Sequence, residues 1–204
     1  MNFILLATAL FPLIGGPSTG KTTIINALKE AGEVIVTEAA TDFIAAEQAK
    51  GNPAPWLLPN FEARLFDERI LREEQGKFLA QQQQKSFVFI DRGLLDTVIY
   101  LDTLGQQNTS QATYIYQQIE NLNPSARYTA CFFIEPYNGS EFQLIPSPVR
   151  KETTEEALFL ADLTKNTYTA AGLPIISVPP YLTPKERALF VLKKAHEITA
   201  ALEN

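Results

Sequence analysis

The sequence contains only one cysteine, Cys131, and one histidine, His196, among its 204 residues. A single cysteine cannot form a disulfide within the chain, and the apolar residues around Cys131 predict a small, buried hydrophobic side chain. With so few cysteine and histidine ligands, the sequence offers no credible zinc site. The chain also lacks an excess of basic residues. Its net charge of −6 argues against a nucleic-acid partner, whose binding surface would be basic.

The sequence has no apolar run long enough to cross a bilayer. Residues 3–14 are nearly all apolar, but this stretch is too short to span a membrane. No basic segment precedes it and a glycine-rich motif follows it at once, so we do not expect a signal peptide. The length and composition predict one domain over residues 1–204, with no membrane partner and a cytoplasmic location.

The glycine-rich motif, GGPSTGKTT, indicates phosphate binding. Residues 15–22 fit the P-loop pattern G-x-x-x-x-G-K-[ST], between an apolar run and a helix-like pattern. Backbone N–H groups of such a loop point at phosphate oxygens; Lys21 would reach the β- and γ-phosphates, and the Thr22 hydroxyl would bind Mg²⁺. We therefore predict ATP and Mg²⁺ as cofactors. The predicted nucleotide-binding residues are Gly15, Gly16, Pro17, Ser18, Thr19, Gly20, Lys21, Thr22 and Thr23.

Strand-like apolar runs alternate with helix-like patterns along the chain. The expected strands are residues 9–14, a short strand at the start of 33–40, 86–91, 128–135 and 173–178. The expected helices are residues 22–32, 41–51, 61–85, 93–105, 110–122, 153–172 and 183–203, and residues 52–60 are expected to form a proline-rich loop. This alternation predicts an α/β fold with a parallel sheet covered by helices on both faces. Ligands of such sheets bind beyond the carboxyl ends of the strands, so the P-loop, Glu38, Asp91 with Arg92, and Glu135 should share one rim.

Three charged residues on this rim are candidates for catalysis. Asp91 ends an expected strand, where an acid can bind Mg²⁺ directly or through water, although it could also cap a helix. Arg92 could bind a phosphate or hold an acceptor. Glu38 could be a general base for an acceptor hydroxyl or an acid favoured by a helix dipole, and both interpretations stay open.

The polar segment 137–153 contains a further cation, Arg150, and precedes an expected helix. Such a loop can close over a nucleotide and bring positive charge to the transferred phosphate, so we predict a lid with Arg150 as a catalytic residue. A solvated surface loop is the alternative. Asp96, one helical turn into the next expected helix, accompanies Glu38 and Arg92 on the acceptor side. Weaker candidates for this side are Trp56, Gln75 and Tyr100, each of which could equally be a packing residue.

Two further features of the sequence argue against particular classes of P-loop protein. No N-K-x-D motif of a guanine-reading GTPase occurs. Only one helix follows the last expected strand, which leaves no room for the helical second domain of ring-forming ATPases. A small domain with carboxylates and arginines on the rim is typical of a small-molecule kinase.

Several stretches spread over residues 15–192 resemble the small bacterial AAA-domain proteins described as predicted ATPases or kinases. They are GGPSTGKTTIINAL, TEAA, FIDRGLLDTVIYL, VRKE and PKERALFVL. The layout is similar to that of deoxynucleoside and ribosylnicotinamide kinases. The resemblance implies a three-layer P-loop NTPase sandwich with five parallel strands in the order 2-3-1-4-5. It also implies that Glu38 lies near the acceptor hydroxyl and that Asp91 and Arg92 form the acid–arginine pair of nucleoside kinases.

The resulting hypothesis is an ATP-dependent phosphotransferase that acts on a nucleoside-like or other small hydroxyl acceptor. The protein could form a homodimer. The alternative is a nucleotide-dependent ATPase or interaction protein without a small-molecule acceptor. It is favoured by the small number of arginines in segment 137–153, and by Thr41 and Asp42 at positions where the related proteins often have an arginine.

Overall fold

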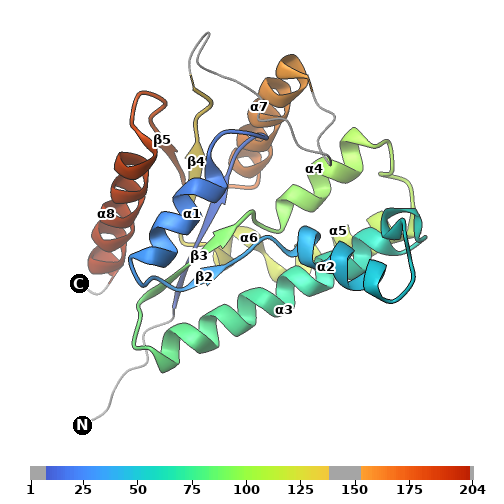
Figure 1. The fold of residues 1–204 in the computed structure, drawn as a ribbon, viewed down its shortest axis with the longest axis horizontal. Helices are drawn as coiled ribbons and strands as arrows, with labels where there is room; N and C mark the ends of the chain where they lie inside the picture. The colour runs from blue at the N-terminus through green and yellow to red at the C-terminus, as the bar shows by residue number, and fades with distance from the viewer. Residues whose placement is uncertain (1–7, 138–152, 203–204) are drawn as a thin grey trace.

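The computed structural model describes residues 8–137 and 153–202 of the chain. A parallel sheet in the order β2-β3-β1-β4-β5 runs through its centre (Figure 1). The strands are β1 (Ala9–Ile14), β2 (Ile35–Val36), β3 (Phe87–Asp91), β4 (Cys131–Ile134) and β5 (Ile175–Val178). The fold class and the strand order predicted from the sequence are confirmed.

The central strand β1 is apolar on both faces because both faces are covered. Leu10 and Ile14 enter the hydrophobic core on one face, whereas Phe11 and Leu13 enter the core on the other. Successive side chains of a strand point to opposite faces, so an alternating sequence would leave one face polar. The continuous apolar run in the sequence is therefore what a doubly covered strand requires.

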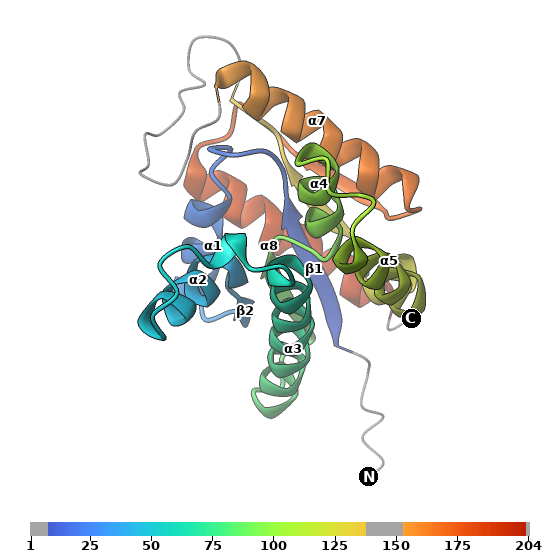
Figure 2. The same ribbon diagram turned by 90° about the vertical axis from the view of Figure 1, so that its right-hand side faces the viewer.

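Helices form the two outer layers. On the face of Phe11 and Leu13 lie α1 (Lys21–Glu30) and α8 (Pro184–Leu202), side by side in Figure 1. The other face is covered by α3 (Phe61–Gln82), α4 (Leu95–Thr103), α5 (Ser110–Leu122) and α7 (Thr154–Ala170), and Figure 2 shows α4, α5 and α7 together on one side of β1. Helix α2 (Ala39–Ala49) packs instead on α3, through contacts such as Phe43 with Phe61. None of the helices in the described part of the chain combines the length and the apolar composition needed to cross a membrane.

Two short helices were not expected from the sequence. They are η1 (Pro55–Leu57), inside the proline-rich stretch expected to be a loop, and α6 (Pro124–Arg127). Each begins with a proline, which has no N–H to lose and whose fixed φ suits the first turn of a helix. Residues 138–152, which include Arg150 and most of the predicted lid, lie outside the described residues.

Pro12 lies in the central strand, where a proline removes one hydrogen bond from the sheet. The carbonyl of Leu13 accepts from the Arg92 N–H on the β3 side, and the carbonyl of Leu10 accepts from the Thr129 N–H on the β4 side. Because successive residues of a strand face opposite neighbours, Pro12 faces β4. The pairing of β1 with β3 runs through Pro12, whereas the registered pairing with β4 begins only after it.

Gly76 marks the closest approach of α3 to β2, and it provides a test of this packing. A Cβ atom there would lie 2.5 Å from Val36 Cγ2 and 3.3 Å from Val88 Cγ1. We expect Gly76→Ala to lower the free energy of unfolding by about 1–3 kcal/mol through overpacking, although alanine is the better helix former. Urea unfolding measures the change, with the exposed Gln75→Ala as control. Adding Val36→Ala should recover part of the loss, and a Gly76→Ala variant as stable as the wild type would contradict this packing.

Candidate functional site

The P-loop joins β1 to α1 and is folded around a lysine. Gly15, Ser18 and Gly20 have positive φ angles of 141°, 58° and 93°. These conformations curve the loop so that the Lys21 ammonium donates to the carbonyl oxygens of Gly15 and Gly16, at 2.7 and 2.6 Å. The lysine predicted to bind phosphate is therefore held within the loop, at the start of α1.

The surroundings of Lys21 make its charge sensitive to an anion. The side chain is buried, and burial lowers its pKa to about 7, with a further lowering by the positive charge of Arg92. The carboxylates of Asp91, Asp96 and Glu38 oppose this effect. A phosphate arriving in the loop would add negative charge and favour the charged ammonium.

Gly16 lies against α7, which packs on the outside of the loop. A Cβ atom at this position would lie 2.5 Å from the carbonyl oxygen of Ala157 and 2.9 Å from the Cβ of Ala161. A backbone carbonyl cannot swing aside as the end of a long side chain can. The close approach of the P-loop to α7 therefore requires glycine here.

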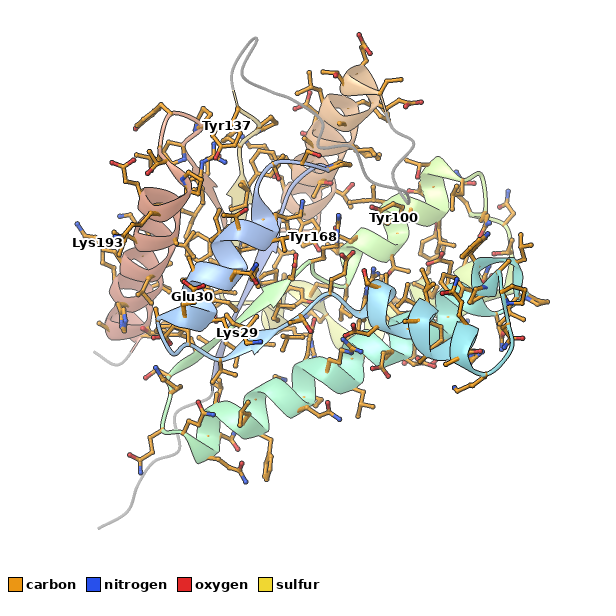
Figure 3. The ribbon with its side chains drawn as sticks, in the orientation of Figure 1. Lys29, Glu30, Tyr100, Tyr137, Tyr168 and Lys193 are labelled. Atoms are coloured by element: carbon orange, nitrogen blue, oxygen red, sulfur yellow. The ribbon has the colours of Figure 1, made fainter. Side chains whose placement is uncertain are left out.

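Arg187 of α8 supports the P-loop from the opposite side. Its side chain is completely buried, and its Nη1 donates to the Thr19 carbonyl while Nη2 donates to the Pro180 carbonyl, both at 3.0 Å. The guanidinium carbon lies 4.0 Å from the ring centre of Tyr137, which is labelled between β4 and α8 in Figure 3. Burial lowers the pKa of Arg187. The sequence analysis did not identify this residue.

Thr22 and Asp91 supply oxygen atoms of the kind that bind Mg²⁺. Thr22 is exposed on the first turn of α1, and Asp91 ends β3. The Asp91 carboxylate makes no hydrogen bond or ion pair with any other described residue. Burial raises its pKa, and the positive charges of Arg92 and Lys21 lower it.

These two donors fit Mg²⁺ only together with other ligands. Within residues 8–137 and 153–202, no group of three or more histidine, cysteine, aspartate or glutamate side chains could hold a metal ion. Mg²⁺ is usually bound by one or two carboxylates together with phosphate oxygens and water. A bound nucleotide would therefore complete the coordination.

Arg92 brings together the acidic residues predicted on the rim. Its Nε lies 2.9 Å from Glu38 Oε1, and its Nη1 lies 3.1 Å from Asp96 Oδ1. The Nε–H is not aligned for a hydrogen bond, so the contact with Glu38 is ionic. Burial alone would lower the pKa of Arg92, but Tyr100, Glu38, Asp96 and Asp91 together raise it well above its usual value. The guanidinium carbon lies 5.9 Å from the ring centre of Tyr100.

Asp96 is held in turn by Tyr168 of α7. The Tyr168 hydroxyl donates to Asp96 Oδ2 at 2.7 Å, and burial followed by the charge of Asp96 raises its pKa well above the usual value. A Cβ atom on Gly93 would lie 2.5 Å from this hydroxyl oxygen, so α7 packs directly against the turn after Arg92. Figure 3 labels Tyr168 beside the sheet and Tyr100 farther out on α4.

A second buried network fixes the start of α4. The Leu94 N–H donates to the Tyr128 hydroxyl oxygen at 2.9 Å, and the Tyr128 hydroxyl donates to Glu73 Oε1 at 2.6 Å. The Arg127 Nε donates to Glu73 Oε2 at 2.6 Å. Burial raises the pKa of Glu73, whereas Arg127 and Tyr128 lower it. The turn that carries Arg92 is thus anchored to α3 as well as to α7.

Comparison with known proteins identifies the family. Residues 10–187 match the family described as an AAA domain. This chain is a member of that family. The match confirms the AAA-domain resemblance seen in the sequence. A comparison with curated proteins found no match.

Solved structures with the same fold include two of the NadR protein and one of a deoxyadenosine kinase. NadR in complex with NR has a TM-score of 0.64 at 18% identity, over 95% of this chain and 52% of that chain. NadR in complex with NAD and AMP-PNP has a TM-score of 0.61 at 18% identity, over 95% and 50%. Deoxyadenosine kinase from M. mycoides with bound dATP has a TM-score of 0.52 at 17% identity, over 92% and 99%. This AAA domain spans about half the length of the NadR chains, and the likeness to all three is one of fold.

The other candidate residues of this AAA domain lie in different surroundings. Tyr100 is close to Arg92, as described above. Trp56 is 54% exposed in η1. Gln75 lines a groove between β2 and α3 together with Thr37 and Arg72.

The contact between Gly16 and α7 leads to a test of the P-loop conformation. Gly16→Ala should push the loop away from α7 and weaken ATP binding by about tenfold or more, measured by calorimetry. Gly32→Ala is the control: Gly32 has a positive φ of 81°, but a Cβ atom there would meet nothing within 4 Å. The control should lose stability and keep its ATP affinity. If Gly16→Ala folds and binds ATP like the wild type, the loop does not need this packing.

Proposed function

We propose that this AAA domain is an ATP-dependent kinase that transfers the γ-phosphate to a hydroxyl group of a nucleoside-like or other small molecule. The observation that carries the proposal is the position of Arg92, held between Glu38 and Asp96 on the rim that also carries Lys21. Hydrolysis of ATP alone would not need a second group of charges beside the P-loop. A kinase needs one, because it must orient an acceptor as well as the nucleotide.

The P-loop residues would hold the nucleotide. The backbone N–H groups of residues 15–23 and the Lys21 ammonium would bind the phosphates, and Thr22 and Asp91 would bind Mg²⁺. The metal would neutralise charge on the β- and γ-phosphates. The role of Arg150 as a lid cation remains a proposal from the sequence.

The acceptor residues would be Glu38 and Arg92. The acceptor oxygen would form a bond to the γ-phosphorus while the bond from that phosphorus to the β–γ bridging oxygen breaks, and ADP would leave with the electron pair. The hydroxyl proton would pass to the Glu38 carboxylate. Arg92 would keep this carboxylate in place and contribute positive charge near the transferred group.

The ligands named for the three similar structures support this proposal by analogy of fold. NR and dATP contain ribose or deoxyribose, and AMP-PNP is an analogue of ATP. The deoxyadenosine kinase is matched over 99% of its length, so the same fold can hold a nucleotide such as dATP. At 17–18% identity the analogy does not identify the acceptor of this chain.

The test of the proposed function is turnover. The protein is incubated with Mg-ATP and a panel of nucleosides, ribosylated vitamins and other small alcohols, and ADP release is measured with and without each compound. A kinase gives ADP release that depends on one class of acceptor and a phosphorylated product. Slow hydrolysis unaffected by every compound would favour the nucleotide-dependent interaction protein instead.

Nucleotide binding itself should depend on Lys21. We expect Lys21→Ala to weaken ATP binding by about a hundredfold, because it removes a buried positive charge that contacts two phosphates. Calorimetry measures the affinity. Lys29→Ala, in the last turn of the same helix (Figure 3), removes a charge far from the loop and should bind ATP normally. Unchanged affinity in Lys21→Ala would contradict the P-loop assignment.

The two rim acids should differ in function. Asp91→Asn should weaken Mg²⁺-dependent nucleotide binding and slow every turnover, including background hydrolysis, because Asp91 acts through the metal. Glu38→Gln should keep Mg-ATP affinity and background hydrolysis but lower acceptor-dependent transfer by about a hundredfold, the usual effect of losing a positioned base. Binding and initial rates are measured for both variants. If Glu38→Gln loses Mg-ATP binding as Asp91→Asn does, Glu38 belongs to the metal site.

A further inference from the structure

A small hollow opens where the carboxyl ends of β2 and β3 meet α3, and three arginines line it. They are Arg69, Arg72 and Arg92, and the hollow is also lined by Thr37 and Asp91. It therefore adjoins the residues proposed above to bind Mg²⁺ and the acceptor. Arginines are seldom fully buried without a paired charge, so the partner of each one is informative.

Two of these arginines have carboxylate partners within the protein. Arg92 pairs with Glu38 and Asp96, as described above. Arg72 places its Nη1 2.8 Å from Asp42 Oδ2 and its Nε 2.8 Å from Glu68 Oε1. Their charges are thus matched without a ligand.

Arg69 differs from both. Its side chain is buried, with 8% of the residue exposed, and its Nη1 donates to the hydroxyl of Thr97 on α4. Within residues 8–137 and 153–202, no carboxylate lies at ion-pair distance from its guanidinium. A buried guanidinium without a counter-charge is unfavourable, so the position calls for an anion.

Neither an ion pair with Glu62 nor the hydrogen bond to Thr97 explains why a charged residue occupies this buried position. Glu62, seven residues earlier on α3, has a pKa that burial raises and Arg69 lowers, so the two charges interact, but they do not form a contact pair. The hydrogen bond to Thr97 links α3 to α4, but a neutral donor would satisfy a hydroxyl oxygen equally well. Glu73 lines the same hollow, but its two carboxylate oxygens are bonded to Arg127 and Tyr128. Arg69 therefore has no ion-pair partner in the described part of the protein.

We propose that Arg69 binds an anionic group of the acceptor, so that the acceptor carries a phosphate or carboxylate in addition to its reacting hydroxyl. This inference rests on the proposed kinase function, which makes the hollow part of an acceptor site. Thr97, which holds Arg69, follows Asp96, which holds Arg92, so one turn of α4 positions both arginines. A guanidinium presents paired N–H groups that match the two oxygens of a carboxylate or phosphate, and burial strengthens the interaction.

The first test measures anion binding without an acceptor. The protein is saturated with Mg-AMP-PNP, which occupies the P-loop, and titrated with inorganic phosphate or with acetate while thermal unfolding is followed. The midpoint should rise by about 3 °C when the free anion concentration reaches ten times its dissociation constant. The anion with the stronger effect identifies the preferred group.

Variants decide whether Arg69 is responsible for this shift. Arg69→Met should abolish it, and Arg69→Lys, which keeps the charge but loses the paired N–H groups, should retain part of it. Lys77→Met, on the same helix and paired with Glu74, is the control and should retain all of it. Thr97→Val keeps the charge of Arg69 but removes the hydrogen bond that positions it, so this variant should retain part of the shift. A wild-type protein that shows no shift, or an Arg69→Met protein that keeps it, overturns the proposal.

The second test uses pairs of acceptors that differ in one charged group, such as a nucleoside with its 5′-monophosphate, or glycerol with glycerol phosphate and glycerate. The anionic member should have the higher kcat/KM, and Arg69→Met should lower kcat/KM about a hundredfold for that member alone. A preference for the neutral member, or an equal loss for both members in Arg69→Met, overturns the proposal. If no compound is phosphorylated but the anion shift still depends on Arg69, the kinase proposal fails and the anion site stands.

Discussion

The ion pairs of Arg92 are the interaction on which the arrangement of the site depends. One guanidinium connects Glu38, at the start of α2, with Asp96, on α4, and so draws together the ends of two neighbouring strands. The backbone of Arg92 has a φ of 71°, an unfavourable conformation for a residue with a side chain. Its N–H is bonded to the carbonyl of Leu13 in the central strand, which holds this conformation in place. Strain of this kind is commonly found at functional sites.

Helix α7 connects the two halves of the site. Near its start, Ala157 and Ala161 pack on Gly16 of the P-loop, and near its end the Tyr168 hydroxyl holds Asp96. The nucleotide loop and the arginine on the acceptor side are therefore positioned against the same rigid element. A shift of α7 along its axis would change both at once.

The sequence predicted the candidate site best where the residues of the site are adjacent in the chain. The P-loop needs only residues 15–22, and the strand ending in Asp91 and Arg92 is equally local, so both were found without the structure. The faces of β1 followed from a continuous apolar run, and the order of the strands came with the family resemblance. The short helix η1 was missed because its prolines suggested a loop, and α6 was missed because four residues are too few to show a helical pattern.

Residues that act through distant partners could not be found in this way. Arg187 contacts Thr19, which lies 168 residues earlier in the sequence. The only indication in the sequence that Arg187 is buried is its position in the apolar stripe of α8, four residues before Val191. Glu38 was ambiguous for the same reason. It occupies the N-cap position of α2 but makes no side-chain capping bond, and its contact with Arg92 joins two residues that follow different strands.

The proline in the central strand interrupts the hydrogen bonds of the sheet on one side only. Pro12 leaves the ladder between β1 and β3 intact and removes a bond on the side of β4. The P-loop follows β1, Glu38 follows β2 and Asp91 ends β3, so all three belong to the side of the sheet whose hydrogen bonds are complete. The strands β4 and β5 and the helix α7 lie on the other side of the missing hydrogen bond. Local stability should therefore differ between the two halves. The strands that lead to the P-loop, Glu38 and Asp91 should therefore open less readily than β4 and β5.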